Sequence, residues 1–272
     1  MNRDRDHKRK PHIARACCAM SVATLSRPAN LYSWWCWSCF IAVVIVFTPP
    51  ILILPGLRTR QRVARRAIRI AWTLCGLRPI ITGAAHLPAE RAIVVANHAS
   101  YLDGLLLTGV LPAGYAFVVK REMSGVPLAG LLLRRLGTAF VARQDAAAAA
   151  RDARSILSRA RNGGAFVFFP EGTIPPGGNL GPFRLGAFLT AAELAYPIVP
   201  ISLVGTAAAL PDDRRWMIFR RHLAVIIHAP VQPTGRKRAD LARLRDAARD
   251  RIEAGLNSGA QIDATPHEDQ RE

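Results

Sequence analysis

Hydrophobic and polar positions divide the chain into two regions of different pattern. Residues 31–54 form one strongly apolar run, and no charged residue occurs from Pro28 to Leu57. From Pro79 onwards, short apolar runs alternate with longer amphipathic segments, which is typical of strands alternating with helices. We therefore expect an α/β fold with a mixed, largely parallel sheet flanked by helices, preceded by an N-terminal membrane-associated helical segment.

The spacing of apolar positions also predicts the individual elements. Strands are predicted at residues 80–82, 92–95, 115–119, 138–141, 165–169, 198–204 and 224–228. Helices are predicted at residues 102–110, 128–135, 146–162, 183–195 and 239–256. Pro200 lies inside a predicted strand, and because proline cannot donate to a ladder we expect it at a sheet edge or a strand end.

Composition divides the chain into five segments. They are a disordered basic arm at residues 1–30, a transmembrane or membrane-dipping helical hairpin at 31–57, a basic amphipathic interfacial helix at 58–78, a folded domain at 79–257 and a disordered tail at 258–272. Low hydrophobicity with high charge predicts the disorder of both ends.

The apolar segment and the basic helix after it both indicate a membrane. Because Pro49 and Pro50 would break a helix, a hairpin that dips into the membrane fits better than a single span. Both flanks are basic, so we expect both ends of the hairpin and the folded domain on the cytoplasmic side of the inner membrane. The arginines of residues 58–75 favour a helix lying on anionic headgroups. The alternative is an arginine face in solvent on a helix packed against the folded domain.

The charge balance narrows the range of partners. Lys and Arg total 37 against 19 acidic residues, a formal net charge of +18, which favours polyanions. Much of this charge flanks the apolar segment, and no zinc-finger spacing or RNA-binding aromatic motif accompanies it. We therefore expect anionic membrane lipids as partners and no nucleic acid. The five cysteines are an odd number and all precede residue 76, which argues against a disulfide framework and against a metal site.

Polar residues follow the predicted strand at 92–95 and carry the first candidate chemistry. His98 and Asp103 are five positions apart and converge if the chain turns between them. The carboxylate would then accept the imidazole N–H, and the other ring nitrogen would remove a proton from a hydroxyl. The alternative is that Ser100-x-x-Asp103 is a capping-box-like helix start, with His98 a loop residue. Both interpretations fit these residues taken alone.

Four motifs in order resemble the four blocks of the glycerophospholipid acyltransferase family, whose best-known members are the lysophosphatidic acid acyltransferases. They are Asn97-His98-x-x-x-x-Asp103 and the runs at residues 137–143, 169–173 and 198–201. The resemblance covers Pro79 to Pro230. It implies that an acyl thioester, either acyl-CoA or acyl carrier protein, donates a fatty acyl group to the hydroxyl of a lysophospholipid, without a cofactor or a metal.

The resemblance also implies roles for individual residues. His98 would be the general base and Asp103 its orienting partner, and because no G-x-S-x-G nucleophile motif is present, the acyl group would pass directly to the acceptor. The substrate-binding candidates are Asn97, Arg143, Glu171, Gly172, Thr173 and Arg184.

Most of the substrate-binding candidates have a structural alternative, which for Gly172 is a plain strand-to-loop turn. Asn97 would steady the turn or the acceptor, or bond its own backbone at the helix entry. Glu171 would anchor its loop or bind the acceptor. Arg143 at a strand end and Arg184 at a helix start would bind phosphate, or be ordinary surface charges.

The favoured acceptor is 1-acyl-sn-glycerol 3-phosphate, which would become phosphatidic acid. The chain departs from the family pattern at Ile174, where a basic or small polar residue usually follows Glu-Gly-Thr. This departure leaves another lyso acceptor, such as a lyso-ornithine lipid, as an alternative. A non-catalytic basic protein that binds membranes or nucleic acid is a more distant one.

Overall fold

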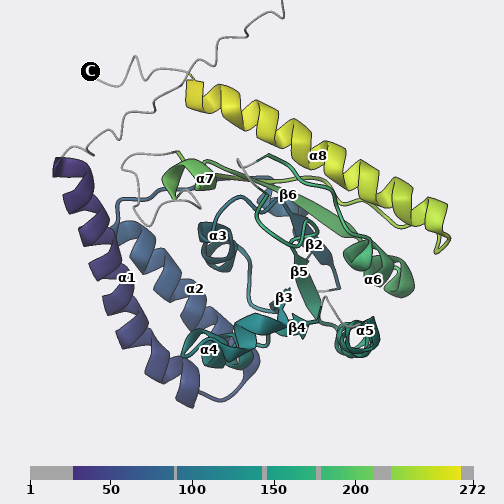
Figure 1. The fold of residues 1–272 in the computed structure, drawn as a ribbon, viewed down its shortest axis with the longest axis horizontal. Helices are drawn as coiled ribbons and strands as arrows, with labels where there is room; N and C mark the ends of the chain where they lie inside the picture. Colours follow the sequence, from purple (N-terminus) through teal and green to yellow (C-terminus); the bar gives the residue numbers. More distant parts are fainter. Residues whose placement is uncertain (1–26, 89–90, 143–145, 176–178, 211–221, 265–272) are drawn as a thin grey trace, which may run out of the picture.

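One sheet of seven strands forms the centre of the part that the computed structural model describes, which is residues 27–264 except 89–90, 143–145, 176–178 and 211–221. The strand order is β1-β7-β6-β2-β5-β3-β4, and all neighbours are parallel except β6 and β7. The predicted mixed, largely parallel α/β fold is confirmed (Figure 1). The strands are β1 (Ile80–Thr82), β2 (Ile93–Ala96), β3 (Tyr115–Lys120), β4 (Ala139–Val141), β5 (Ala165–Phe168), β6 (Ile198–Val204) and β7 (Ala224–Ile227).

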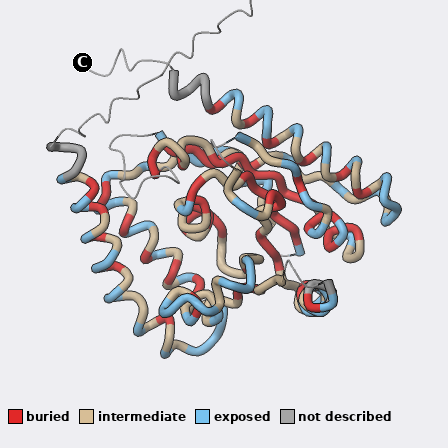
Figure 2. Tube along the Cα trace, in the orientation of Figure 1, coloured by how far each residue is buried: buried red, intermediate tan, exposed pale blue. Residues whose placement is uncertain are grey.

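Helices cover both faces of this sheet, so buried residues concentrate in its strands (Figure 2). On one face, Val94 and Val167 pack with α3 residues and with Trp72 of α2. On the other face, β-strand residues pack with residues of α5, α6 and α8. Burial on both faces explains why the strands read as continuous apolar runs. The helices of the domain are α3 (Leu102–Val110), α4 (Ala129–Arg135), α5 (Ala146–Arg161), α6 (Gly186–Leu194), α7 (Thr206–Ala209) and α8 (Arg238–Ala264), with short 3-10 turns η1 (Ala84–His86) and η2 (Arg121–Gly125).

The parallel strands bring five loops to one side of the sheet. The segments that follow β2, β3, β4, β5 and β6 all leave the sheet at the carboxyl ends of these strands. We call this side the carboxyl edge. Open α/β sheets bind their ligands at this edge, and the His98 motif directly follows β2 there.

Pro200 does not mark a sheet edge, contrary to the expectation. It lies within β6, which has β2 on one side and β7 on the other. The ladder between β6 and β7 begins only at Ile201, which pairs with Ile227. At Pro200 the carbonyl accepts the N–H of His228 at 3.0 Å, so the missing proline N–H falls one residue beyond the ladder.

The apolar segment forms one continuous helix, α1 (Arg27–Ile53), and the expected break at Pro49 and Pro50 is absent from it. Because proline has no N–H, the carbonyls of Ile45 and Val46 lose their intrahelical partners. Both prolines lie near the end of the helix. The chain turns at Gly56, which has a positive φ of 78°, and α2 (Leu57–Leu74) returns along α1 (Figure 1). A helical hairpin therefore exists, but it consists of α1 and α2. The stretch Leu31–Ile53 is long and apolar enough to cross a membrane.

Helix α2 packs against both α1 and α3. Gln61 donates to the carbonyls of Tyr115 and Leu136, both at 3.1 Å. Arg65 binds the last carbonyls of α3, at Gly109 and Val110. A side chain at Gly109 would overlap the Trp72 ring, because its Cβ would lie 2.2 Å from that ring. The inner face of α2 is therefore a packing surface of the domain.

The outer face of α2 carries exposed arginines. These are Arg58, Arg62, Arg66 and Arg69. Their contact with lipid headgroups, expected from the sequence, is part of the function proposed below.

The ends of the described chain differ from the expected boundaries. Residues 1–26 of the predicted arm lie outside the described residues, and α1 includes its last four positions. Helix α8 continues to Ala264, so the predicted tail at 258–272 is wrong for its first part. Gly255 and Gly259 lie so close to Ser202 and Val204 of β6 that a Cβ would overlap their side chains. These glycines keep α8 on the sheet beyond the last apolar position that sequence periodicity identifies.

Candidate active site

One buried carboxylate oxygen organises the loop between β2 and α3. Asp103 Oδ2 accepts His98 Nδ1 at 2.9 Å, the N–H of Ala99 at 2.7 Å and the N–H of Ser100 at 2.8 Å. Because a carboxylate only accepts, Nδ1 carries the ring hydrogen and Nε2 carries the lone pair. Asp103 is fully buried, whereas the His98 side chain is 22% exposed. His98 therefore has a fixed tautomer and access to solvent.

The two interpretations of this motif describe the same geometry. Asp103 lies in the first turn of α3 and accepts the Ser100 N–H, as the acidic residue of a capping box does. Ser100 Oγ in turn donates to the Leu210 carbonyl at 2.8 Å. Asp103 Oδ1 is buried without a hydrogen-bond partner among the described residues. A proton arriving on His98 would therefore be stabilised by a carboxylate whose other contacts are backbone N–H groups.

Asn97 ties the end of β2 to β6. Its Nδ2 donates to the Leu203 carbonyl at 3.0 Å, and its Oδ1 accepts the Leu203 N–H at 2.7 Å. The side chain is buried, with 4% exposure. Asn97 therefore steadies the start of the turn, one of the roles considered from the sequence, and does so through the backbone of β6.

Glu171, in the loop that follows β5, binds the same motif. Its Oε1 accepts the backbone N–H of His98 at 2.8 Å, and its Oε2 accepts the N–H of Gly181 at 2.7 Å. Burial raises the pKa of the Glu171 carboxyl, and these two N–H donors offset only part of that rise. Both oxygens are occupied by the protein, so the contacts are those of a loop anchor.

Phe169 has a role that the sequence did not reveal. Its ring stacks on the His98 imidazole with centroids 4.3 Å apart and an interplanar angle of 22°. Such a stack restricts rotation of the imidazole. The available signal was the position of Phe169 at the end of a strand, since β5 is the neighbour of β2.

Arg184 lies over Gly172 in the segment before α6. Gly172 has a positive φ of 84°, and a Cβ there would meet Arg184 Nε at 3.1 Å. The backbone N–H of Arg184 donates to the Pro170 carbonyl at 2.9 Å, and the Arg184 side chain is exposed. Thr173 is also exposed beside it. The structure thus brings an accessible guanidinium to the loop that also anchors His98.

The structure brings most of the predicted site residues together. His98, Asp103, Glu171, Gly172 and Arg184 belong to the adjacent ends of β2 and β5. Arg143 lies outside the described residues.

An apolar cavity of about 230 Å³ lies beside the His98 motif. Tyr101 and Leu102, from within the motif itself, line it together with Leu105 and Leu106 of α3. The remaining wall comes largely from the hairpin of α1 and α2, which we call the membrane hairpin. It contributes Cys36, Trp37 and Phe40 of α1 and Ile68, Ala71 and Trp72 of α2. A long hydrocarbon chain fits the chemistry of this lining.

Residues 78–204 match the family model described as Acyltransferase. The 1-acyl-sn-glycerol-3-phosphate acyltransferase alpha of Ovis aries is 31% identical over 222 residues, which cover 78% of this chain and 74% of the relative. The chain belongs to the acyltransferase family. This confirms the family that the four motifs indicated.

Two further acyltransferases extend the comparison. The chloroplastic 1-acyl-sn-glycerol-3-phosphate acyltransferase BAT2 of Brassica napus is 30% identical over 81% of this chain, which spans 64% of that relative's length. The solved 1-acyl-sn-glycerophosphate (LPA) acyltransferase PlsC of Thermotoga maritima shares the fold, with a TM-score of 0.69, 24% identity and coverage of 89% of this chain and 97% of that one.

The anchoring role of Glu171 predicts the effect of Glu171→Gln. Glutamine has one carbonyl oxygen, so either the His98 or the Gly181 N–H loses its acceptor. We expect the free energy of unfolding to fall by about 1–3 kcal/mol and acyl transfer to slow, because the His98 backbone is released. Chemical denaturation and initial rates measure both effects.

The matched control is Glu193→Gln, which removes a partly exposed ion pair with Arg236 at 3.6 Å. It should change stability by no more than about 1 kcal/mol. Equal stability and equal rates in the two variants would contradict the anchoring role.

Proposed function

We propose that this acyltransferase moves a fatty acyl group from acyl-CoA or acyl carrier protein to the free hydroxyl of 1-acyl-sn-glycerol 3-phosphate, forming phosphatidic acid. The observation that carries the proposal is the His98–Asp103 pair, held at 2.9 Å at the carboxyl edge. The exposed Arg184 and an apolar cavity lie near this pair. The names of the relatives above support the same acceptor.

The proposed reaction uses His98 as base and then as acid. Nε2 takes the proton of the acceptor hydroxyl while its oxygen attacks the thioester carbonyl. Asp103 stabilises the imidazolium that forms, and the stacked Phe169 ring restricts its rotation. The tetrahedral intermediate then collapses, the C–S bond breaks, and the leaving thiolate takes the proton from His98. No covalent acyl-enzyme is required.

Arg184 is the proposed partner of the acceptor phosphate. Its guanidinium is exposed next to Gly172 and Thr173, on the loop whose Glu171 holds the His98 backbone. The phosphate of the acceptor lies only a few bonds from the reacting hydroxyl, so a cation near His98 is required. The resemblance adds Arg143 as a second phosphate ligand. An exposed cation at this place favours a phosphate acceptor over a lyso-ornithine lipid.

The membrane hairpin lies along the surface in this proposal. Tyr32 and Trp35 of α1 bond the carbonyls of Cys75 and Leu74 at one end of the hairpin, and Arg135 bonds the Leu52 carbonyl at the other. If α1 crossed the bilayer, the arginines of α2 would enter hydrocarbon at a cost of about 2.5–3.5 kcal/mol each near its centre. Helix α1 therefore inserts into one leaflet with its apolar outer face, and the exposed arginines of α2 contact anionic headgroups.

The dyad predicts the effects of His98→Ala and Asp103→Asn. His98→Ala should lower kcat by about 10²–10⁴-fold, since proton removal is lost, and Asp103→Asn should be nearly as damaging through loss of imidazole orientation. Rates with palmitoyl-CoA and lysophosphatidic acid test this.

The control is His86→Ala, because His86 follows β1 at the opposite side of the sheet and should have little effect on kcat. Near-normal turnover in a folded His98→Ala protein would exclude the assignment.

Phosphate recognition predicts the effect of Arg184→Ala. Loss of a charge-assisted contact should weaken the binding of lysophosphatidic acid by about 1.5–3 kcal/mol and raise its KM accordingly. The KM for a monoacylglycerol, which has no phosphate, should stay unchanged. The control is Arg236→Ala, an exposed arginine paired with Glu193. An unchanged KM for lysophosphatidic acid would assign Arg184 to the surface.

The one-leaflet hairpin predicts that both ends of α1 face the cytoplasm. In a background without native cysteines, Arg27→Cys and Arg58→Cys should both resist a membrane-impermeant maleimide in intact cells and react in inverted membrane vesicles. These positions lie at the start of α1 and at the turn into α2. A span would expose only one of them to the outside, and labelling of one in intact cells would show it.

A further inference from the structure

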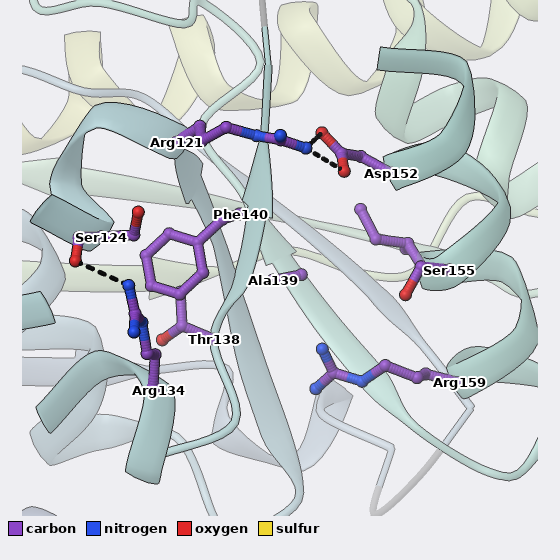
Figure 3. A pocket seen from close by; sticks show the side chains of 10 residues that line it. Arg121, Ser124, Arg134, Thr138, Ala139, Phe140, Asp152, Ser155 and Arg159 are labelled. Carbon is purple, nitrogen blue, oxygen red and sulfur yellow. Dashed lines mark hydrogen bonds and ion pairs between the residues drawn. The ribbon is translucent and has the colours of Figure 1, made fainter. Parts of the chain in front are cut away.

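A second cavity, of about 380 Å³, runs along the unpaired side of edge strand β4. We call it the β4 pocket and define it by Arg121, Ser124, Arg134, Thr138, Asp152 and Arg159. Figure 3 shows Arg134 from α4 and Arg159 from α5 on opposite sides of the strand. Its volume lies within the range of small-molecule sites.

The β4 pocket carries excess positive charge. Arg121 is neutralised by Asp152, whose two carboxylate oxygens lie 2.6 and 2.7 Å from its Nη2. Arg134 donates to the Ser124 carbonyl, and Arg159 donates to the Gly137 carbonyl. Within the described part of the chain, neither of these two guanidinium groups forms an ion pair.

Arg159 is the more constrained of these two cations. It lies over the Phe166 ring, 5.2 Å from its centroid. Burial lowers the pKa of its guanidinium, which means that the cation is partly desolvated without an opposite charge. A bound anion would supply that charge. The Thr138 side chain, directly before β4 and between the two arginines, adds a further hydrogen-bond donor.

The distance from His98 decides which anion fits. The base follows β2, and β4 is three strand spacings to the side in the order β2-β5-β3-β4, about 14 Å at the usual spacing. Arg159 bonds the Gly137 carbonyl, which precedes β4, so it is further from His98 than this sideways spacing. The acceptor phosphate cannot reach the β4 pocket while its neighbouring hydroxyl is at His98. The donor differs, because its thioester and its phosphate groups are at opposite ends of a pantetheine arm.

We propose that the β4 pocket binds the phosphate of the acyl donor's pantetheine arm. The proposal rests on the acyltransferase function above and assigns its second substrate a place. The arm extends from the β4 pocket, beside β4, to the carboxyl edge, then past the ends of β3 and β5, and brings the thioester to His98. Acyl-CoA and acyl carrier protein share this phosphopantetheine chemistry.

Kinetics with a series of donors test the proposal on the full chain. The donors are S-palmitoyl-pantetheine, S-palmitoyl-4′-phosphopantetheine, palmitoyl-CoA and palmitoyl–acyl carrier protein. Arg134→Ala and the milder Arg159→Gln should raise the KM for phosphorylated donors about ten-fold or more, as expected for loss of a charge-assisted hydrogen bond. The KM for palmitoyl-pantetheine and for lysophosphatidic acid should stay the same.

The control is Arg161→Ala, an exposed arginine of the same helix that does not line the β4 pocket. An effect with phosphopantetheine supports the proposal, whereas an effect confined to palmitoyl-CoA would place the nucleotide phosphates in the β4 pocket and overturn it. An equal rise for the unphosphorylated donor, a rise in the acceptor KM, or no change overturns the proposal.

Direct binding separates this proposal from the proposed function. Calorimetry with CoA and 4′-phosphopantetheine on the detergent-solubilised chain needs no acyl transfer. We expect about ten-fold weaker binding in Arg134→Ala and unchanged binding in Arg161→Ala. Equal affinities in wild type and Arg134→Ala, or no binding of either probe by the wild type, overturn the β4 pocket even if transfer is observed. Failure of transfer with the expected binding pattern overturns the function alone.

Discussion

The Asp103 carboxylate is the contact on which the rest of the site depends. One buried oxygen accepts three N–H groups, and these fix the start of α3, the bend of the loop and the tautomer of His98 together. Asn97 joins this loop to β6 and Glu171 joins it to β5. The base is thus attached to three adjacent strands. A side chain positioned in this way loses little conformational entropy when the substrate arrives.

The sequence revealed the elements better than the contacts between them. Strands covered on both faces appear as apolar runs, and amphipathic helices appear by their period, so nearly every element was predicted within a few residues. The chemistry of His98 and Asp103 was also visible, because the two lie five positions apart. The partners of Asn97 and Glu171 were not, since they are backbone groups 106 and 73 positions away. Backbone partners leave no signature in residue type.

The wrong boundaries have equally specific causes. Local propensity predicts that α1 breaks at its prolines and that α8 ends near Asn257. In the structure, α1 is supported along α2, and Gly255 and Gly259 let α8 approach β6 closely. Tertiary packing therefore overrides local preference at both ends of the described chain.

The hairpin and the domain share one structural unit, which bears on how the substrates meet. Residues of α1 and α2 line the apolar cavity, whose other wall includes two residues of the His98 motif. In the proposed function, a leaflet-bound α1 therefore brings lipid acyl chains beside the base without a separate transfer step. The phosphate groups must then approach from the polar carboxyl edge. Arg184 lies over the loop that anchors His98, whereas the β4 pocket lies several strands away. The strand order therefore separates two phosphate sites. One suits the acceptor, whose phosphate is close to the reacting hydroxyl, and the other suits the donor, whose phosphate is far from the thioester. A parallel sheet keeps these positions at a fixed spacing, because the strands beside which they lie are regularly spaced.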